Sequence, residues 1–325
     1  MSTPITPLPA LPPMGRSVRA FFAPVDRVHR VSALFDPSIN GRFDSNAPPV
    51  PWVDLGWIEN FTRKSTSKFG EVITGSPGTT QFQVRETVDA TVSLHFKAWS
   101  KLSMALAAGS QHMNLIVPAA GTVANGSGSK GVPGVNLTAG STATFLAMAA
   151  ADAASFPAGS RVTVDADYAG QTGFVGSGVC AAYVNSAAAV NNDPDYIRRV
   201  SFNVARVLSS SSAGLQLAQP LIAGVPTSGM RVQPICGFVD REGGSFFQEW
   251  SALFVMDGEQ GERILFHYPR LQSMAGAAEA STAMAAPLER ISLNATFRAL
   301  PVTDANDGEQ VVCFRSFLPG AGTLI

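Results

Sequence analysis

Charged side chains are scarce in this chain. They make up 14% of its 325 residues, against roughly 25% in a typical soluble domain. The formal net charge is −1, so there is no basic surplus with which to hold nucleic acid or an acidic membrane. A surface of this kind can be covered without desolvating many ions, which suits a subunit surrounded by copies of itself. A genome of high GC content would enrich alanine and glycine in the same way, and composition does not separate the two explanations.

Cysteine and histidine are also few. The three cysteines, Cys180, Cys236 and Cys313, form no CxxC pair, which argues against a zinc or redox site. The four histidines show no HExxH or similar spacing. The glycine-rich segment 121–131 lacks the GxxxxGK[ST] spacing of a phosphate loop. We therefore expect no metal site and no cofactor.

Segments that would enter a membrane are missing as well. The sequence contains no window of about 18 apolar residues. Its first fifteen residues are rich in proline and lack the basic and apolar regions of a secretory signal. We expect these residues to form an extended arm, and the chain to fold in a cytoplasm without contacting a membrane.

Catalytic patterns are weak. Asp165 and Asp167 form an acidic pair, but their spacing places both on one face of a strand, and no EF-hand pattern accompanies them. No GxSxG elbow with a plausible triad is present. We expect no catalytic residues and no enzymatic activity.

One long alternating run dominates the first third of the chain. From Gln81 to Phe96 the even-numbered residues are apolar, with the single exception of Glu86, and the odd-numbered residues are polar. Side chains on a strand point to opposite faces in turn, so the run predicts one strand, or two strands of a hairpin, with one apolar and one polar face. A single strand of this length would span about 50 Å, whereas strands usually have about 5–6 residues. Such an element needs a large barrel, a projecting hairpin or neighbouring chains to cover it.

The remaining pattern is mostly that of strands. Strand character is found at 17–22, 28–35, 53–58, 161–168, 179–184, 197–208, 249–256, 263–268, 290–299 and 311–318. Residues 63–68 are polar and basic and predict a turn or loop. Helical spacing of Trp99, Leu102 and Leu106 predicts a helix over 97–108, ended by Gly109. We expect Trp99 and Trp250 to be packed in the core.

These elements divide the chain into four parts. Residues 1–49 form an extended arm and loop, and residues 50–117 begin the main β domain with the helix 97–108. Residues 118–229 form an inserted or elaborated β subdomain, and residues 230–325 complete the main domain. The fold class that follows is mainly β.

The order of the elements resembles the major tail protein, or tail tube protein, of long-tailed bacteriophages. The resemblance covers residues 50–117 and 237–318: a short strand, a loop, the long alternating element, one helix, and late strands ending in a closing strand. It implies a β-sandwich or half-barrel subunit with one flanking α-helix and a long projecting hairpin. Six such subunits would close into a ring with a continuous β-barrel as its inner wall, and rings would stack into the tail tube of a virion. Its partners would be copies of itself, other tail proteins, and DNA that passes through the lumen without specific binding during ejection.

The resemblance also assigns roles to residues. The polar residues of the run would face the lumen: Gln81, Gln83, Arg85, Thr87, Asp89, Thr91, Ser93 and His95. Five residues would contact a neighbouring subunit: Trp52, Trp57, Arg63, Lys64 and Lys68. The even-numbered face of the run would lie on the subunit's own core.

Three alternatives remain open at this stage. The chain could be a capsid decoration or head-to-tail connector protein of a virion. It could be a carbohydrate-binding β-sandwich module with Trp52 and Trp57 as a sugar platform. An enzyme built around Asp165 and Asp167 ranks third.

Overall fold

The computed structural model describes residues 15–26, 29, 31–120, 131–165, 201–242, 248–259, 261–274, 279–283 and 289–320. The described part is mainly β, which confirms the fold class expected from the sequence. The chain divides into two compact units. The first unit comprises Met1–Val25, Arg30–Ala108 and Gln248–Ile325, and the second comprises Asp26–His29 and Gly109–Phe247. The sequence had placed the corresponding boundaries at 117/118 and 229/230.

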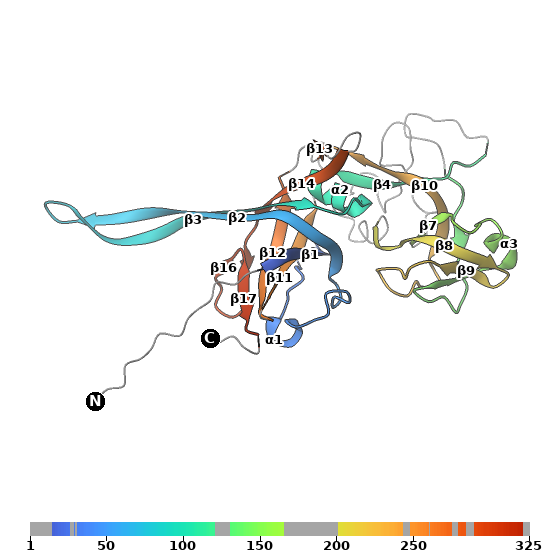
Figure 1. Cartoon of the computed structure of the whole chain (residues 1–325), viewed down its shortest axis with the longest axis horizontal. Coiled ribbons are helices and arrows are strands. Elements are labelled where there is room, and N and C mark those ends of the chain that lie inside the picture. Colours follow the sequence, from blue (N-terminus) through green and yellow to red (C-terminus); the bar gives the residue numbers. More distant parts are fainter. Residues whose placement is uncertain are drawn as a thin grey trace. The chain divides into compact units, whose positions relative to one another are not determined.

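The first unit contains two helices and most of the long strands (Figure 1). Its elements are β1 (Gly15–Pro24), α1 (Pro37–Asn40), β2 (Val53–Thr74), β3 (Thr79–Phe96), α2 (Lys101–Ala108), β11 (Glu249–Gly258), β12 (Arg263–Ser273), β13 (Glu279–Ala283), β14 (Glu289–Ala299), β15 (Val302–Thr303), β16 (Gln310–Val311) and β17 (Phe314–Leu318). The second unit contains β4 (Gln111–Ile116), β5 (Val135–Asn136), β6 (Phe145–Ala147), α3 (Ala150–Ala153), β7 (Arg161–Asp165), β8 (Val204–Ser211), β9 (Gly214–Leu217) and β10 (Arg231–Arg241).

The main sheet of the first unit closes on itself. Its strand order is β13-β14-β3-β2-β1-β11-β12-β17, and β12 also pairs with β14, so that β14, β3, β2, β1, β11 and β12 form a ring. The closing contact joins Leu271–Ser273 to Phe297–Ala299. All of these pairings are antiparallel. The predicted hairpin of 249–256 and 263–268 is confirmed as β11 and β12.

The inside of this closed sheet is an aromatic core. Phe22 of β1 is fully buried, and its ring lies 5.7 Å from Phe297 and 5.9 Å from Phe254 between ring centroids. Phe96 and Trp250 complete the cluster at 6.4 Å. Alternation along each strand sends one residue in two to this core, which explains the run of apolar residues at every second position of β3.

A second apolar layer covers the outside of the sheet. Phe21, the neighbour of Phe22, points outward and packs with Phe35, Phe43 and Trp52 from the connection between β1 and β2. Residues 31–36, predicted as part of a strand, form this irregular cover instead, apart from a single bridge residue at Val31. Two buried layers on opposite faces fix the orientation of β1.

Helix α2 packs against β12 and β14. It begins at Lys101 rather than at residue 97 because the two serines before and within its first turn cap it. Ser100 Oγ accepts a hydrogen bond from the Ser103 N–H at 3.0 Å, and Ser103 Oγ accepts one from the Ser100 N–H at 2.8 Å. Such a reciprocal cap satisfies amide groups that the helix leaves unpaired at its start. Trp99 lies before the helix and is 47% exposed, so its predicted core position is wrong, whereas Trp250 is buried as predicted.

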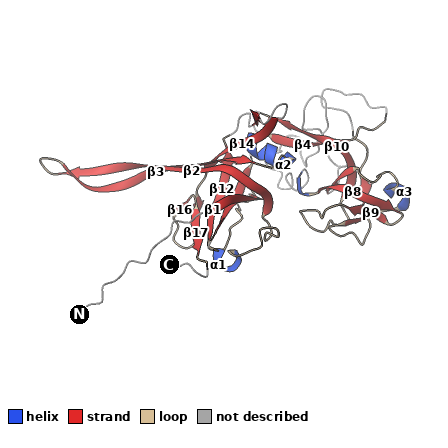
Figure 2. Cartoon of the chain, viewed as in Figure 1, coloured by secondary structure: helices blue, strands red, loops and turns tan. Residues whose placement is uncertain are grey.

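The second unit is built on a separate antiparallel sheet with the order β4-β10-β7-β8-β9-β6, to which β5 adds through β10. Figure 2 draws its strands in red. Its core includes the fully buried Leu146, Val162, Val164, Val207 and Leu215. The predicted strand at 179–184 and residue Asp167 lie outside the described residues. No helix in the described part of the chain has the length and apolar character of a membrane span.

Candidate functional site

The hairpin of β2 and β3 extends well beyond the sheet that carries it. β1 pairs with β2 only over Val53–Ile58, and β14 pairs with β3 only over Thr91–Phe96. From Ser65–Ala90 outward the two strands pair only with each other, as far as Thr74–Thr79. Figure 1 shows both arrows running on past the neighbouring strands. The outer hairpin, residues 65–90, is therefore a two-stranded ribbon of about 30 Å.

This arrangement corrects the expectation for residues 63–68. They are not a turn, because they continue β2 and pair with β3 throughout. The alternating run itself is a single strand, and the partner that completes the hairpin comes from the segment before it. The sequence signal was weak in β2 because residues 62–68 contain no apolar side chain.

One face of the outer hairpin is apolar and uncovered. Directly opposite residues share a face, so the pairs Val72–Phe82 and Gly70–Val84 place Val72, Phe82 and Val84 together. Phe82 is 58% exposed and Val84 52%. We call Val72, Phe82 and Val84 the apolar face. A bulge at Glu86 shifts the register, so Val88, opposite Ser67, lies on the other face and is followed there by Ala90, Val92, Leu94 and Phe96, all of which are buried.

The expectation that the whole even-numbered face lies on the subunit's own core is therefore wrong for its outer half. Only residues from Ala90 onward reach the interior of the closed sheet. The outer half has no core to lie on, because no other strand of the described chain reaches it.

The bulge divides the predicted lumen-facing residues between the two faces of the hairpin. Gln83 and Arg85 lie on the face opposite the apolar face: Gln83 donates from Nε2 to Glu71 Oε1 at 3.3 Å, and the guanidinium of Arg85 lies over the ring of Phe69 at 5.7 Å. Thr87 and Asp89 lie beyond the bulge, on the same side as Val84. Gln81, Thr87 and Asp89 are exposed in the outer half, and Thr91, Ser93 and His95 are half-buried near the sheet. All eight belong to one strand, but they do not form one continuous row.

The hairpin carries balanced charge. Lys64, Lys68 and Arg85 stand against Glu71, Glu86 and Asp89. Lys68 Nζ lies 3.0 Å from Glu86 Oε2. Asp89 lies 3.4 Å from Arg298 of β14. Exposed pairs of this kind contribute little stability, and a hairpin with no net charge attracts polyanions weakly.

Arg63 occupies the point where the hairpin of β2 and β3 leaves the closed sheet. It lies opposite Val92, on the same face. Its Nε donates to the Tyr268 hydroxyl at 2.6 Å, its Nη2 lies 3.4 Å from Cys313 Sγ, and its guanidinium lies 4.2 Å from the ring centroid of Phe266. Burial raises the pKa of Tyr268 to about 12, and the neighbouring Arg63 opposes this rise. Arg63 thus closes the end of the subunit's own core.

The other predicted contact residues have different environments. Trp52 is only 6% exposed and packs edge-on against His267 at 5.7 Å, so it belongs to the subunit's own core. Trp57 is 42% exposed, with the Arg19 guanidinium 5.3 Å from its ring. Because Trp52 is buried, the two tryptophans do not form an exposed platform for a sugar. Lys64 and Lys68 are exposed on the outer hairpin.

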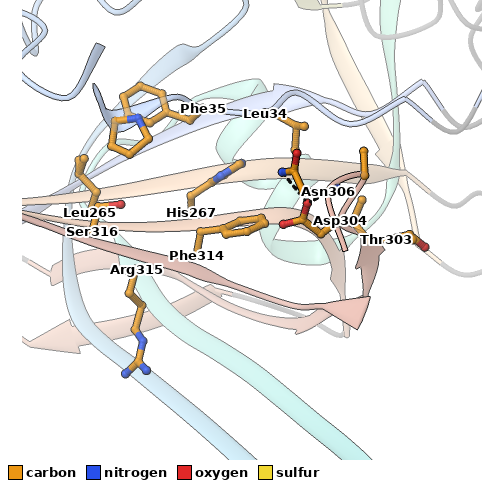
Figure 3. Close-up of a pocket in the computed structure, with 13 residues that line it drawn as sticks. Leu34, Phe35, Leu265, His267, Thr303, Asp304, Asn306, Phe314, Arg315 and Ser316 are labelled. Atoms are coloured by element: carbon orange, nitrogen blue, oxygen red, sulfur yellow. Dashed lines mark hydrogen bonds between the residues drawn. The ribbon is translucent and has the colours of Figure 1, made fainter. Parts of the chain in front are cut away.

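A cavity of about 400 Å³ lies on the outer side of β12 and β17 (Figure 3). Its floor is formed by Leu265 and His267 of β12 and Phe314 of β17, and Leu34 and Phe35 form one wall. The rings of His267 and Phe314 are stacked at 5.8 Å. The opposite wall is the segment 302–306, where Asn306 donates to Asp304 Oδ1 through both its backbone N–H and its side chain.

His267 is a neutral side chain in this cavity. Its Nε2 lies 3.2 Å from the Ala33 carbonyl oxygen, to which the neutral ring donates. Burial lowers its pKa to about 4, because a charged imidazolium would lose its hydration. No pattern in the sequence indicates this cavity, because its residues come from four separate segments.

Only one member of the acidic pair suggested by the sequence lies among the described residues. Asp165 ends β7, and Asp167 lies outside the described residues. Within the described ranges no group of three or more histidine, cysteine, aspartate or glutamate side chains is placed to hold a metal ion.

Comparison with known proteins gives no relative. The sequence matches no protein-family model, and no curated protein is similar enough to it to count as a match.

Proposed function

We propose that the chain is a structural subunit of a bacteriophage tail tube, which assembles into stacked hexameric rings and forms a conduit for DNA ejection. In this proposal the closed sheet is the tube-forming body, with α2 as the flanking helix and the outer hairpin as its projection. The observation that carries the proposal is the set of exposed apolar side chains on the outer hairpin, above all Phe82 and Val84, which no other strand of the described chain covers.

The physical reason is the instability of such a ribbon alone. A two-stranded hairpin without a third strand or a packed layer is marginally stable in water. Its free edges also invite pairing with other chains. A neighbouring copy that covered Val72, Phe82 and Val84 would supply the missing layer, and ring closure would use the free edges in an ordered way.

The face opposite the apolar face supports the second part of the proposal. With the apolar face turned to a neighbour, the other face, which carries Gln83 and Arg85 of β3 and Ser67 and Glu71 of β2, would line the channel. Amide and hydroxyl groups with balanced charges hold DNA weakly, as passage requires. The partners would be other copies and other tail proteins, and the location would be the virion tail.

Negative-stain electron microscopy and native mass spectrometry of the purified full chain test the proposal. We expect hexamers or open polymers that appear as rings or tubes of constant diameter. Trimers would favour a capsid decoration protein instead. A monomer at every concentration, with no rings or tubes, would contradict the proposal.

A further inference from the structure

The cavity on the outer side of β12 and β17 has the chemistry of a site for an uncharged, proline-rich segment. Its floor consists of Leu265 and the stacked rings of His267 and Phe314. Arg315, the charged residue nearest to this floor in sequence, points away from the cavity in Figure 3. Aromatic-lined grooves bind proline-rich segments because these are already extended and lose little entropy on binding.

The chain itself contains one such segment. Residues 1–14 carry five prolines and no charged side chain, and their apolar residues include Ile5, Leu8 and Leu11. The described chain begins directly after them, at Gly15 of β1. Fully extended in a polyproline conformation, fourteen residues reach about 43 Å.

The direction of β1 decides which copy of the cavity this segment meets. Gly15 lies opposite Gly258, at the end of β11. The cavity floor lies level with a later part of β1. Leu265 pairs with Val255, which pairs with Arg19, and His267 pairs with Leu253, which pairs with Phe21. Arg19 and Phe21 follow Gly15 by four and six residues, so the floor lies about 13–20 Å from Gly15 along the strand. A segment that continues the line of β1 moves away from the cavity of its own subunit.

We infer that residues 1–14 of one copy dock in the cavity between β12, β17 and segment 302–306 of a neighbouring copy. The inference rests on the proposed function, because it needs adjacent copies. It adds a directed link between subunits that is independent of the outer hairpin. The occupant is uncharged, and so is the floor that receives it.

Photo-crosslinking of the full chain tests this link. Leu8 is replaced by p-benzoylphenylalanine, copies with natural and ¹⁵N isotopes are mixed in equal amounts and assembled, and the cross-linked peptides are identified by mass spectrometry. We expect cross-links from position 8 to peptides that contain His267, Phe314 or residues 302–306. Joined peptides of unlike isotope should be about half of the total, as random mixing of copies requires.

Two variants fill the cavity from its exposed wall: Ala305→Trp and, separately, Thr303→Trp. Each should lower the cross-link yield about tenfold, which corresponds to a loss of about 1.4 kcal/mol in the free energy of docking. Ala213→Trp, in an exposed turn of the second unit, is the matched control and should leave the yield unchanged. Circular dichroism confirms that each variant is folded.

The outcomes separate the two proposals. If native mass spectrometry shows rings but cross-links are absent, join only peptides of like isotope, or map elsewhere, the docking inference is overturned and the proposed function stands. If the chain stays monomeric, both are overturned.

Discussion

Replacing Phe82 and Val84 with threonine should prevent assembly while leaving the subunit folded. Threonine keeps the β-branched shape that strands favour, so the hairpin itself is retained. Both side chains are more than half exposed in the single chain, and surface changes of this kind alter the free energy of unfolding by about 0.5 kcal/mol or less.

The two substitutions weaken the contact between subunits, because the side chains are buried only when a neighbour covers the hairpin. Full burial of a phenylalanine or valine side chain stabilises by about 1.5–3 kcal/mol. Since roughly half of each side chain is still exposed, covering it gives about 1 kcal/mol for each residue. The double variant then loses about 2 kcal/mol at each subunit contact, which lowers the association constant of that contact about 30-fold.

Sedimentation of polymer over a concentration series, followed by negative-stain microscopy, measures this effect. The control is the double variant Gln83→Thr and Arg85→Thr, which puts the same residues on the opposite face of the same strand. It should assemble at the wild-type concentration. The reasoning is refuted if the Phe82 and Val84 variant assembles as readily as the wild type, or if the control is impaired to the same degree.

Three further predictions concern the first unit, and tryptophan fluorescence during urea denaturation reads them selectively because all four tryptophans lie in that unit. Arg63→Met should lower the free energy of unfolding by about 2 kcal/mol, since it removes a charged hydrogen bond to Tyr268 and a cation–π contact; Lys64→Met, on the exposed side of the same strand, should change it little, and equal effects would contradict the role given to Arg63. His267 has a native pKa of about 4, so the stability it contributes is complete above pH 6.5 and falls by up to about 3 kcal/mol as the pH drops to 4. His267→Gln should weaken this acid sensitivity. Parallel curves of unfolding free energy against pH for variant and wild type would show that His267 is not its source. Ser100→Ala should cost about 1 kcal/mol through loss of the helix cap, and an unchanged urea midpoint would show that the cap is dispensable.

The sequence predicted elements well where one face of a strand is buried. β3 was recognised because an apolar residue at every second position is the direct consequence of a covered face, and β14 shows the same pattern. β11 is buried on both faces and contains a continuous apolar run instead. The outer half of β2 lacks it, because residues such as Lys64, Ser65 and Lys68 are polar on both faces. Its pairing with β3 is a long-range property that local sequence does not encode.

Other errors have equally local causes. Trp52 follows a proline-rich segment and was expected at the surface, but the connection between β1 and β2 folds back over the sheet and buries it. The start of α2 was placed too early because Trp99 fits the helical spacing, whereas the Ser100 and Ser103 cap sets the true start. The cavity at His267 could not be anticipated, since Leu34, Leu265, Asn306 and Phe314 meet only in the folded chain.

The alternation in β3 has a physical meaning that a single chain does not account for. From Ala90 to Phe96 the even-numbered residues are apolar because they fill the closed sheet. From Phe82 to Val88 the same pattern continues where this sheet offers nothing to fill, on a ribbon whose exposed apolar face and free edges favour disordered aggregation. A solitary subunit would gain stability and solubility from polar residues there. The pattern is advantageous only if another surface covers this face in an ordered way, and copies of the same chain, with the same ribbon and the same free edges, are the simplest source of that surface.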